Sequence, residues 1–180
     1  MVMGDAILAL TERFGLVTVE MLVAVLGLSP NAVVKRLLRR ERRGEFVKCR
    51  LIGSRHYWHR KKPLGTQALA RRFAVMAFCC LGESHWELER WDGPAAVCSR
   101  VGRREAVVVD LGGPADHVAR RKLRDFCAER QERLASYAGL SVLTPTAEKA
   151  RKIGLAAREH TLPLPVRCVV IEDLFYLLAH

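Results

Sequence analysis

Apolar residues recur at helical spacing in three short segments at the start of the chain. The first is DAILALTERFG, and the second is VEMLVAVLG, which follows a capping Thr18 and ends at Gly27. The third begins with Ser29 as N-cap and Pro30 at the first helical position, and it ends at Gly44. The pattern predicts three helices within this part of the chain.

A different pattern follows in EFVKCRLIGSRHYWHRKK, which alternates and is enriched in β-branched and aromatic residues. With Gly53-Ser54 at its centre, this stretch predicts a two-stranded hairpin. The segment KKPLG then breaks the pattern and marks a boundary. We therefore expect one domain over residues 1–62 and a second over residues 66–180.

The second domain mixes helical and extended patterns. A helix is expected over residues 66–81, with apolar residues on one face and Arg71 and Arg72 on the opposite face. After it we expect three strands, a long helix, a strand, a helix, a strand and a final helix, in the segments HWELERW, AAVCSRV, EAVVVDLGG, PADHVARRKLRDFCAERQERLASYAG, LSVLTP, TAEKARKIGLAAREH, VRCVVI and EDLFYLLAH. The predicted fold class is α+β.

The charge is strong and uneven. The 180 residues carry a formal net charge of +11, which favours a polyanionic partner, nucleic acid before an acidic membrane surface. Residues 1–62 hold 13 Lys and Arg against 5 Asp and Glu, whereas residues 63–180 hold 17 against 14. The positive charge is therefore concentrated in the first third of the chain.

The cysteines and the hydropathy pattern indicate the cellular compartment of the protein. The 6 cysteines show no C-x-x-C spacing and most lie in apolar runs, so we expect reduced thiols, no metal site and no cofactor. The opening MVMGDAIL lacks the basic start of a signal peptide, and FAVMAFCCL is too short to span a bilayer. A cytoplasmic protein without a membrane partner is expected.

The N-terminal order of two helices, a basic helix and a hairpin is that of a winged helix-turn-helix. The segment VEMLVAVLGLSPNAVVKRLLRRERRGEFVK resembles bacterial winged-helix regulators, and the matching residues are Gly27, Ser29, Pro30, Val33, Leu37 and Gly44. In such a domain the third helix is held to the first two by its apolar face and presents the other face to a major groove. The alternative for the charge run alone is a solvated basic helix.

Several residues of this region are candidates for DNA contact: Ser29, Asn31, Lys35, Arg36, Arg39, Arg40, Arg43, Lys48, Arg55, His56, Arg60 and Lys61. The early helix residues are expected near base edges, and the later arginines, including Arg42, near phosphates. Val34 and Leu38 lie close to the face expected to be wet, which indicates an additional packing or protein contact. Tyr57 and Trp58 are expected to pack the hairpin against the helices rather than stack on a base.

The order helix, three strands, helix, strand over residues 66–171 is the core order of the restriction-endonuclease-like fold. In that group, acids on the second and third strands bind magnesium, and a lysine two residues after the second acid assists the attacking water. Asp92 and Asp110 stand for the acids here, but Gly112 occupies the position of that lysine. Lys122 is the candidate replacement if the domain is a nuclease.

The whole arrangement resembles the replication-relaxation family of plasmids and conjugative elements. The segments EAVVVDLGGPADHVARRKLRDF and LSVLTPTAEKARKI carry this resemblance together with the winged helix. It implies a DNA-binding accessory protein in replication, mobilisation or its regulation. Because the nuclease lysine is missing and the C-terminal DLFYLLAH is strongly apolar, we expect a non-enzymatic homodimer. It would bind double-stranded DNA as a transcriptional regulator or as a replication or mobilisation accessory factor, with a relaxase or replication protein as a further partner. The alternative is a metal-dependent, structure-selective nuclease that uses Asp92 and Asp110. The basic run Arg120, Arg121, Lys122 and Arg124 is either a second DNA contact or a solvated face.

Overall fold

The computed structural model describes residues 3–51, 54–60, 64–82, 85–93, 95–111, 125, 127–128, 135–159 and 164–178. The described helices are α1 (Met3–Phe14), α2 (Val19–Leu26), α3 (Pro30–Arg42), α4 (Thr66–Cys80), α7 (Ala147–Glu159) and α8 (Asp173–Leu178). The described strands are β1 (Val47–Arg50), β2 (His56–His59), β3 (Glu87–Asp92), β4 (Ala95–Arg100), β5 (Arg103–Val109), β6 (Gly139–Thr144) and β7 (Val166–Val170). The α+β class expected from the sequence is confirmed.

Local capping fixes the starts of α2 and α3. The Thr18 hydroxyl accepts a hydrogen bond from the Met21 amide at 3.2 Å, and Ser29 does the same for Ala32 at 3.3 Å. Between them Gly27 adopts a left-handed φ of 64°, which a glycine takes without steric cost. The chain thereby turns by 118° from α2 into α3.

The hairpin β1–β2 is antiparallel and lies against the helices. Val17, between α1 and α2, exchanges two backbone hydrogen bonds with Trp58, at 3.0 and 2.9 Å. The indole nitrogen of Trp58 also donates to Glu41 of α3 at 3.3 Å. The hairpin is therefore attached to the helical unit through its second strand.

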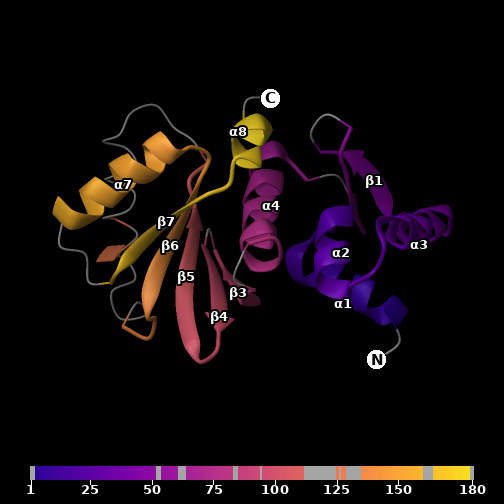
Figure 1. Cartoon of the computed structure of the whole chain (residues 1–180), viewed down its shortest axis with the longest axis horizontal. Coiled ribbons are helices and arrows are strands. Elements are labelled where there is room, and N and C mark those ends of the chain that lie inside the picture. Colours follow the sequence, from indigo (N-terminus) through magenta and orange to yellow (C-terminus); the bar gives the residue numbers. More distant parts are fainter. Residues whose placement is uncertain are drawn as a thin grey trace.

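The five-stranded sheet has the order β3-β4-β5-β6-β7. Its first three strands form an antiparallel meander, whereas β5, β6 and β7 run parallel. All six residues of β6 are buried, as expected for a strand covered on both faces. The helix α7 connects β6 to β7 and packs on one face of the sheet, and α4 lies on the other face (Figure 1).

The helix α4 joins the two halves of the molecule. Its residues from Phe73 to Cys80 are all buried, between the sheet and the N-terminal helices (Figure 1). Arg71 and Arg72, expected opposite the apolar face of this helix, are half-buried. Arg72 donates to the Phe14 carbonyl at 3.0 Å and lies 5.2 Å above the Trp91 ring.

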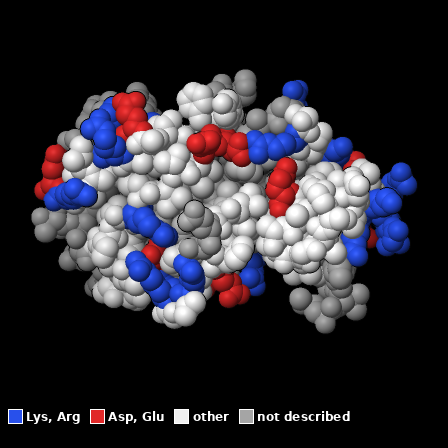
Figure 2. Space-filling model, viewed as in Figure 1, with Lys and Arg blue, Asp and Glu red and all other residues white. Residues whose placement is uncertain are grey.

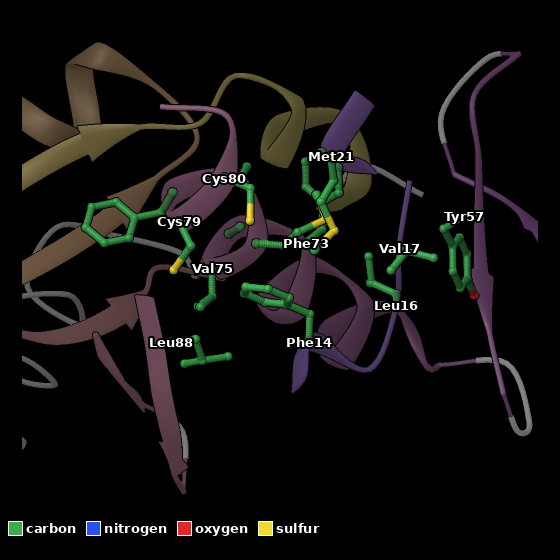
Figure 3. Close-up of a cluster of buried hydrophobic side chains, with 14 of the residues drawn as sticks. Phe14, Leu16, Val17, Met21, Tyr57, Phe73, Val75, Cys79, Cys80 and Leu88 are labelled. Carbon is green, nitrogen blue, oxygen red and sulfur yellow. The ribbon is translucent and has the colours of Figure 1, made fainter. Parts of the chain in front are cut away.

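A continuous hydrophobic cluster crosses the domain boundary expected from the sequence. It includes Phe14 and Met21 of the N-terminal unit, Phe73 and Cys79 of α4, and Leu88 of the sheet (Figure 3). A smaller cluster on the opposite face of the sheet lies under α7. The two units thus share one core through α4.

Two smaller expectations can be compared with the structure, and a third lies largely outside the described residues. The pattern of VEMLVAVLG places Val25 on the buried face of α2 with Met21 and Leu22, but Val25 is 42% exposed, because it lies in the last turn of the helix. The six cysteines form no disulfide. Most of the long helix expected before β6 lies outside the described residues, and the described Asp125, Cys127 and Ala128 are helical.

Among the described residues, no single helix is long and apolar enough to cross a membrane. Only α2 and α3 taken together reach the required length and composition, and they are separated by the 118° turn.

Candidate nucleic-acid interface

One face of α3 is buried and the opposite face is open. Val33 and Leu37 are fully buried against the other helices. The exposed residues on the opposite side are Asn31, Lys35, Arg39 and Arg42. Their spacing of four, four and three residues aligns them in one stripe along the helix. We call these four residues the α3 stripe.

The cations of the α3 stripe are not engaged within the protein. Within the described part of the chain, the side chains of Lys35, Arg39 and Arg42 form no ion pair or hydrogen bond. They lie at the end of the molecule formed by α3, where Figure 2 shows basic side chains projecting outward. An open row of cations on a rigid helix is an attractive site for an extended polyanion.

Arg40 of α3 and Arg43 at its C-cap also make contacts within the protein. Arg40 is bound to Glu45 at 2.5 Å and lies 5.6 Å above the Phe46 ring. Arg43 is 3.9 Å from the same Glu45, and Arg36 is half-buried. These contacts fix the turn between α3 and the hairpin, so Arg40 contributes less open charge than the sequence indicates.

Val34 and Leu38, the apolar residues near the face of α3 that was expected to be solvated, lie at the edge of the α3 stripe. Val34 and Leu38 are both half-buried. Neither is among the strongly exposed apolar side chains. The helix therefore changes from apolar to polar across its width, and the stripe itself is polar.

The aromatic residues of the hairpin form packing contacts, as expected. Tyr57 and Trp58 are 2% and 3% exposed, so neither ring is available to stack on a base. Burial, together with a hydrogen bond to Cys49, raises the pKa of Tyr57 to about 12. On the outer side Lys48 is exposed and lies 5.7 Å above the Trp58 ring. Lys48 thus extends the open positive charge from α3 to the hairpin.

Two other basic residues of the hairpin are paired with acids. Arg60 forms an ion pair with Glu12 of α1. Arg55 makes a double hydrogen bond to Asp173 of α8, and this bonding raises its pKa. His56 is half-buried near the Trp58 ring, and Lys61 lies outside the described residues. The hairpin's accessible charge is therefore smaller than its sequence suggests.

The acids expected for a nuclease site lie at one end of the sheet. Asp92 ends β3 and Asp110 follows β5, with β4 between these strands. By register Asp92 is level with Val108, two residues before Asp110, so the two backbones are more than about 10 Å apart by strand spacing. Lys149 of α7 lies 3.4 Å from Asp110, a contact that the sequence analysis missed because it joins residues 39 positions apart. The expected Lys122 lies outside the described residues. In the described part of the chain, no group of three or more His, Cys, Asp or Glu side chains is placed to hold a metal ion.

A buried carboxylate in the sheet was also missed. Glu105 of β5 is 1% exposed and accepts hydrogen bonds from Ser141 at 2.5 Å and from Arg167 at 3.1 Å. Arg103 lies 2.9 Å from its other oxygen. The only sequence signal was a charged residue at a core position of a strand, next to the valines of EAVVV.

No family model, no curated protein and no solved structure matches the chain.

Proposed function

We propose that this protein binds double-stranded DNA through α3, which acts as the recognition helix of a winged helix-turn-helix. The observation that carries the proposal is the α3 stripe, an exposed row of one amide and three cations directly opposite the buried Val33 and Leu37. A helix with one face locked in a core and the other basic and open fits the width of a major groove.

The geometry before and after α3 supports this assignment. Helix-turn-helix units join two helices at about 90–120° through a short turn that often contains glycine. Here the turn includes Gly27 and the angle is 118°. The hairpin β1–β2 follows in the position of a wing and carries the exposed Lys48.

The stripe divides into two parts with different roles. Asn31 and Lys35 lie in the first half of α3 and are assigned to base edges, where an amide suits adenine and an amino group suits guanine. Arg39 and Arg42 lie in the second half and are assigned to phosphates, which fix register without reading sequence. Arg43 lies beside them and adds to the same phosphate contact.

The sheet is assigned a non-enzymatic role in a restriction-endonuclease-like arrangement. The order of α4, the antiparallel β3–β5 and the parallel β6 supports that arrangement. The carboxylate of Asp110 contacts Lys149 and is 18% exposed, which leaves little of it open to an ion. Such a domain serves as a scaffold that carries the DNA-binding unit and a partner surface.

The biological role we propose is that of a regulator or a replication or mobilisation accessory factor of a bacterial mobile element. We also propose a homodimer, in which Phe175 and Tyr176 of α8, each 53% exposed, lie at the contact. A dimer would place two copies of α3 on a two-fold symmetric DNA site. Relaxases and replication proteins remain the proposed protein partners.

Selection of bound duplexes from a random-sequence pool tests the proposal. The full chain should enrich one consensus, and Asn31→Ala should relax the enrichment at one or two base pairs while other positions keep their preference. As a matched control, Gln67→Ala removes an exposed amide from the first turn of α4 and should leave the consensus unchanged. Enrichment of no sequence by the wild-type chain would contradict sequence-specific binding.

A further inference from the structure

The turn between β4 and β5 has an unfavourable conformation for the residue it contains. Val101 and Gly102 occupy its two central positions, with φ angles of 45° and 75°. A two-residue hairpin with positive φ at both positions is a type I′ turn, which strongly favours Asn-Gly. A β-branched residue in this region is sterically disfavoured, so the fold gains nothing from valine here.

Packing does not explain the valine either. Val101 is 98% exposed, the highest exposure among the large hydrophobic residues that the structure describes. Its side chain therefore contributes no buried apolar surface. A strained, fully exposed apolar residue at a turn points to a contact outside the folded chain.

The surroundings of Val101 identify the chemistry of that contact. Arg100 and Arg103 face each other across the two strands on either side of the turn. Behind them the buried Glu105 holds Arg103 and Arg167, whose side chains remain 56% and 47% exposed. Three arginines against one buried carboxylate leave an excess of two positive charges beside the turn. Figure 2 shows this basic group at the end of the sheet.

We propose that the β4–β5 tip, which consists of residues 100–103, is a second DNA contact. It inserts Val101 between base pairs from the minor groove, while Arg100 and Arg103 hold the phosphates on either side. Apolar side chains wedged between base steps, flanked by basic residues, kink duplexes in this way. One valine suits a single base step, whereas attachment to a membrane surface requires a much larger apolar area. The residues are separate from α3, so this inference does not depend on the proposed recognition helix.

The consequence for DNA is a bend at flexible steps. Pyrimidine–purine steps such as TA unstack most easily, so the tip should prefer them to stiff A-tracts. Arg103 is held by Glu105 before binding, which lowers the entropy lost when its side chain contacts phosphate.

The test uses the full chain and two 40-base-pair duplexes with fluorophores at both ends, one with central TA steps and one with an A-tract. Wild-type protein should shorten the end-to-end distance of the TA duplex, and Val101→Asn should lose most of this bend. Because asparagine tolerates the left-handed turn, Val101→Asn should melt at the same or a higher temperature than wild type. The control Leu155→Gln removes an exposed apolar side chain from α7 and should bend the duplex as wild type does.

The arginines give an independent readout. Arg100→Gln combined with Arg103→Gln should reduce the slope of log affinity against log salt by about 1.8, the value for two phosphate contacts. Arg151→Gln combined with Arg158→Gln removes the same charge from α7 and should change the slope less.

Three results would overturn the inference. One is a bend in Val101→Asn equal to that of wild type, and another is an unchanged salt slope in the tip double variant. The third is wild-type binding to vesicles of anionic lipid that Val101→Asn loses, with unchanged DNA bending, because the tip would then be a membrane contact. Failure of the α3 assignment would give a different result. The α3 variants would keep the sequence preference of wild type, while Val101→Asn would still lose the bend.

Discussion

The guanidinium of Arg55, beside the hairpin strand β2, is bound through two hydrogen bonds to the carboxylate of Asp173 in α8, 118 residues later in the chain. This pair connects the proposed wing to the C-terminal part of the molecule. Both side chains are about one-third exposed, so salt and water screen the pair. Its effect on stability is therefore small, and its effect on the wing's orientation is the more important one.

Asp173→Asn tests this connection. Removing the carboxylate should lower the free energy of unfolding by about 0.5–1 kcal/mol, as for an exposed ion pair. It should also tighten DNA binding several-fold, because Arg55 is released and a negative charge is lost near the wing. Chemical denaturation and a fluorescence binding titration measure the two effects. The control Arg55→Gln should lower stability similarly without tightening DNA binding. If Arg55→Gln instead lost as much affinity as Arg39→Ala, Arg55 would be shown to contact DNA in the complex.

His59 should make stability fall in mild acid. Burial lowers the pKa of this side chain below its ordinary value of 6.5, so the folded state holds the neutral ring, near the Cys49 sulfur at 3.5 Å. Above pH 6.5 His59 is neutral in both the folded and the unfolded chain, so its titration does not reduce the free energy of unfolding. As pH falls below 6.5 the unfolded state binds the proton first, and stability is lost by up to about 1.4 kcal/mol per pH unit. Denaturation curves from pH 7.5 to pH 5 should show a steeper decline for wild type than for His59→Gln. Equal slopes would contradict a buried neutral ring.

The shared core predicts cooperative unfolding. Phe73 of α4 is 2% exposed and belongs to the hydrophobic cluster that includes residues from both halves of the chain. Phe73→Ala should lower the free energy of unfolding by about 3–5 kcal/mol. Circular dichroism and tryptophan fluorescence should report one common transition in wild type and a lower common transition in the variant. Two separate transitions in wild type would show that the units at residues 1–62 and 66–180 unfold independently.

The proposal of a non-enzymatic sheet has a direct biochemical check. Incubation with magnesium or manganese and with linear, supercoiled, nicked and branched DNA should give no cleavage above buffer. Asp110 contacts Lys149, and β4 separates it from Asp92, so a metal-bound water is not expected between the two acids. Cleavage by wild type that Asp110→Ala abolishes would establish the nuclease alternative.

Much of the secondary structure followed from the sequence because it depends on local chemistry. Thr18, Gly27, Ser29 and Pro30 set helix boundaries through capping and backbone preference, which act within a few residues. The strands expected from EAVVVDLGG and LSVLTP form the buried centre of the sheet for the same reason, since covered strands are continuously apolar.

What the sequence could not predict depends on contacts between distant segments. Arg72 was placed opposite the apolar face of its helix, but a single helix pattern does not reveal that α4 is covered on two sides. The ion pairs of the candidate DNA contacts could not be predicted for a similar reason. Arg40, Arg55 and Arg60 are basic in sequence, but each is paired with an acid in the fold. Charge alone does not separate open cations from paired ones.

The strain at Val101 was also outside the reach of sequence reasoning. Gly102 lies between the segments AAVCSRV and EAVVVDLGG and predicts a turn there, but the type of turn depends on the register Arg100 to Arg103. Only with that register known does valine stand out as the wrong residue for its backbone angle.

The most direct test of the central claim is the salt dependence of duplex binding by the α3 stripe. Wild type, Arg39→Ala combined with Arg42→Ala, and the charge-matched control Arg151→Ala combined with Arg158→Ala should be titrated against one 30-base-pair duplex from 50 to 300 mM salt. The account predicts that the α3 variant binds at least tenfold more weakly at 150 mM salt and that its log–log slope falls by about 1.8. The α7 control should stay within threefold of wild type. Equal affinity and slope for the α3 variant and the control would contradict α3 as the DNA-binding helix.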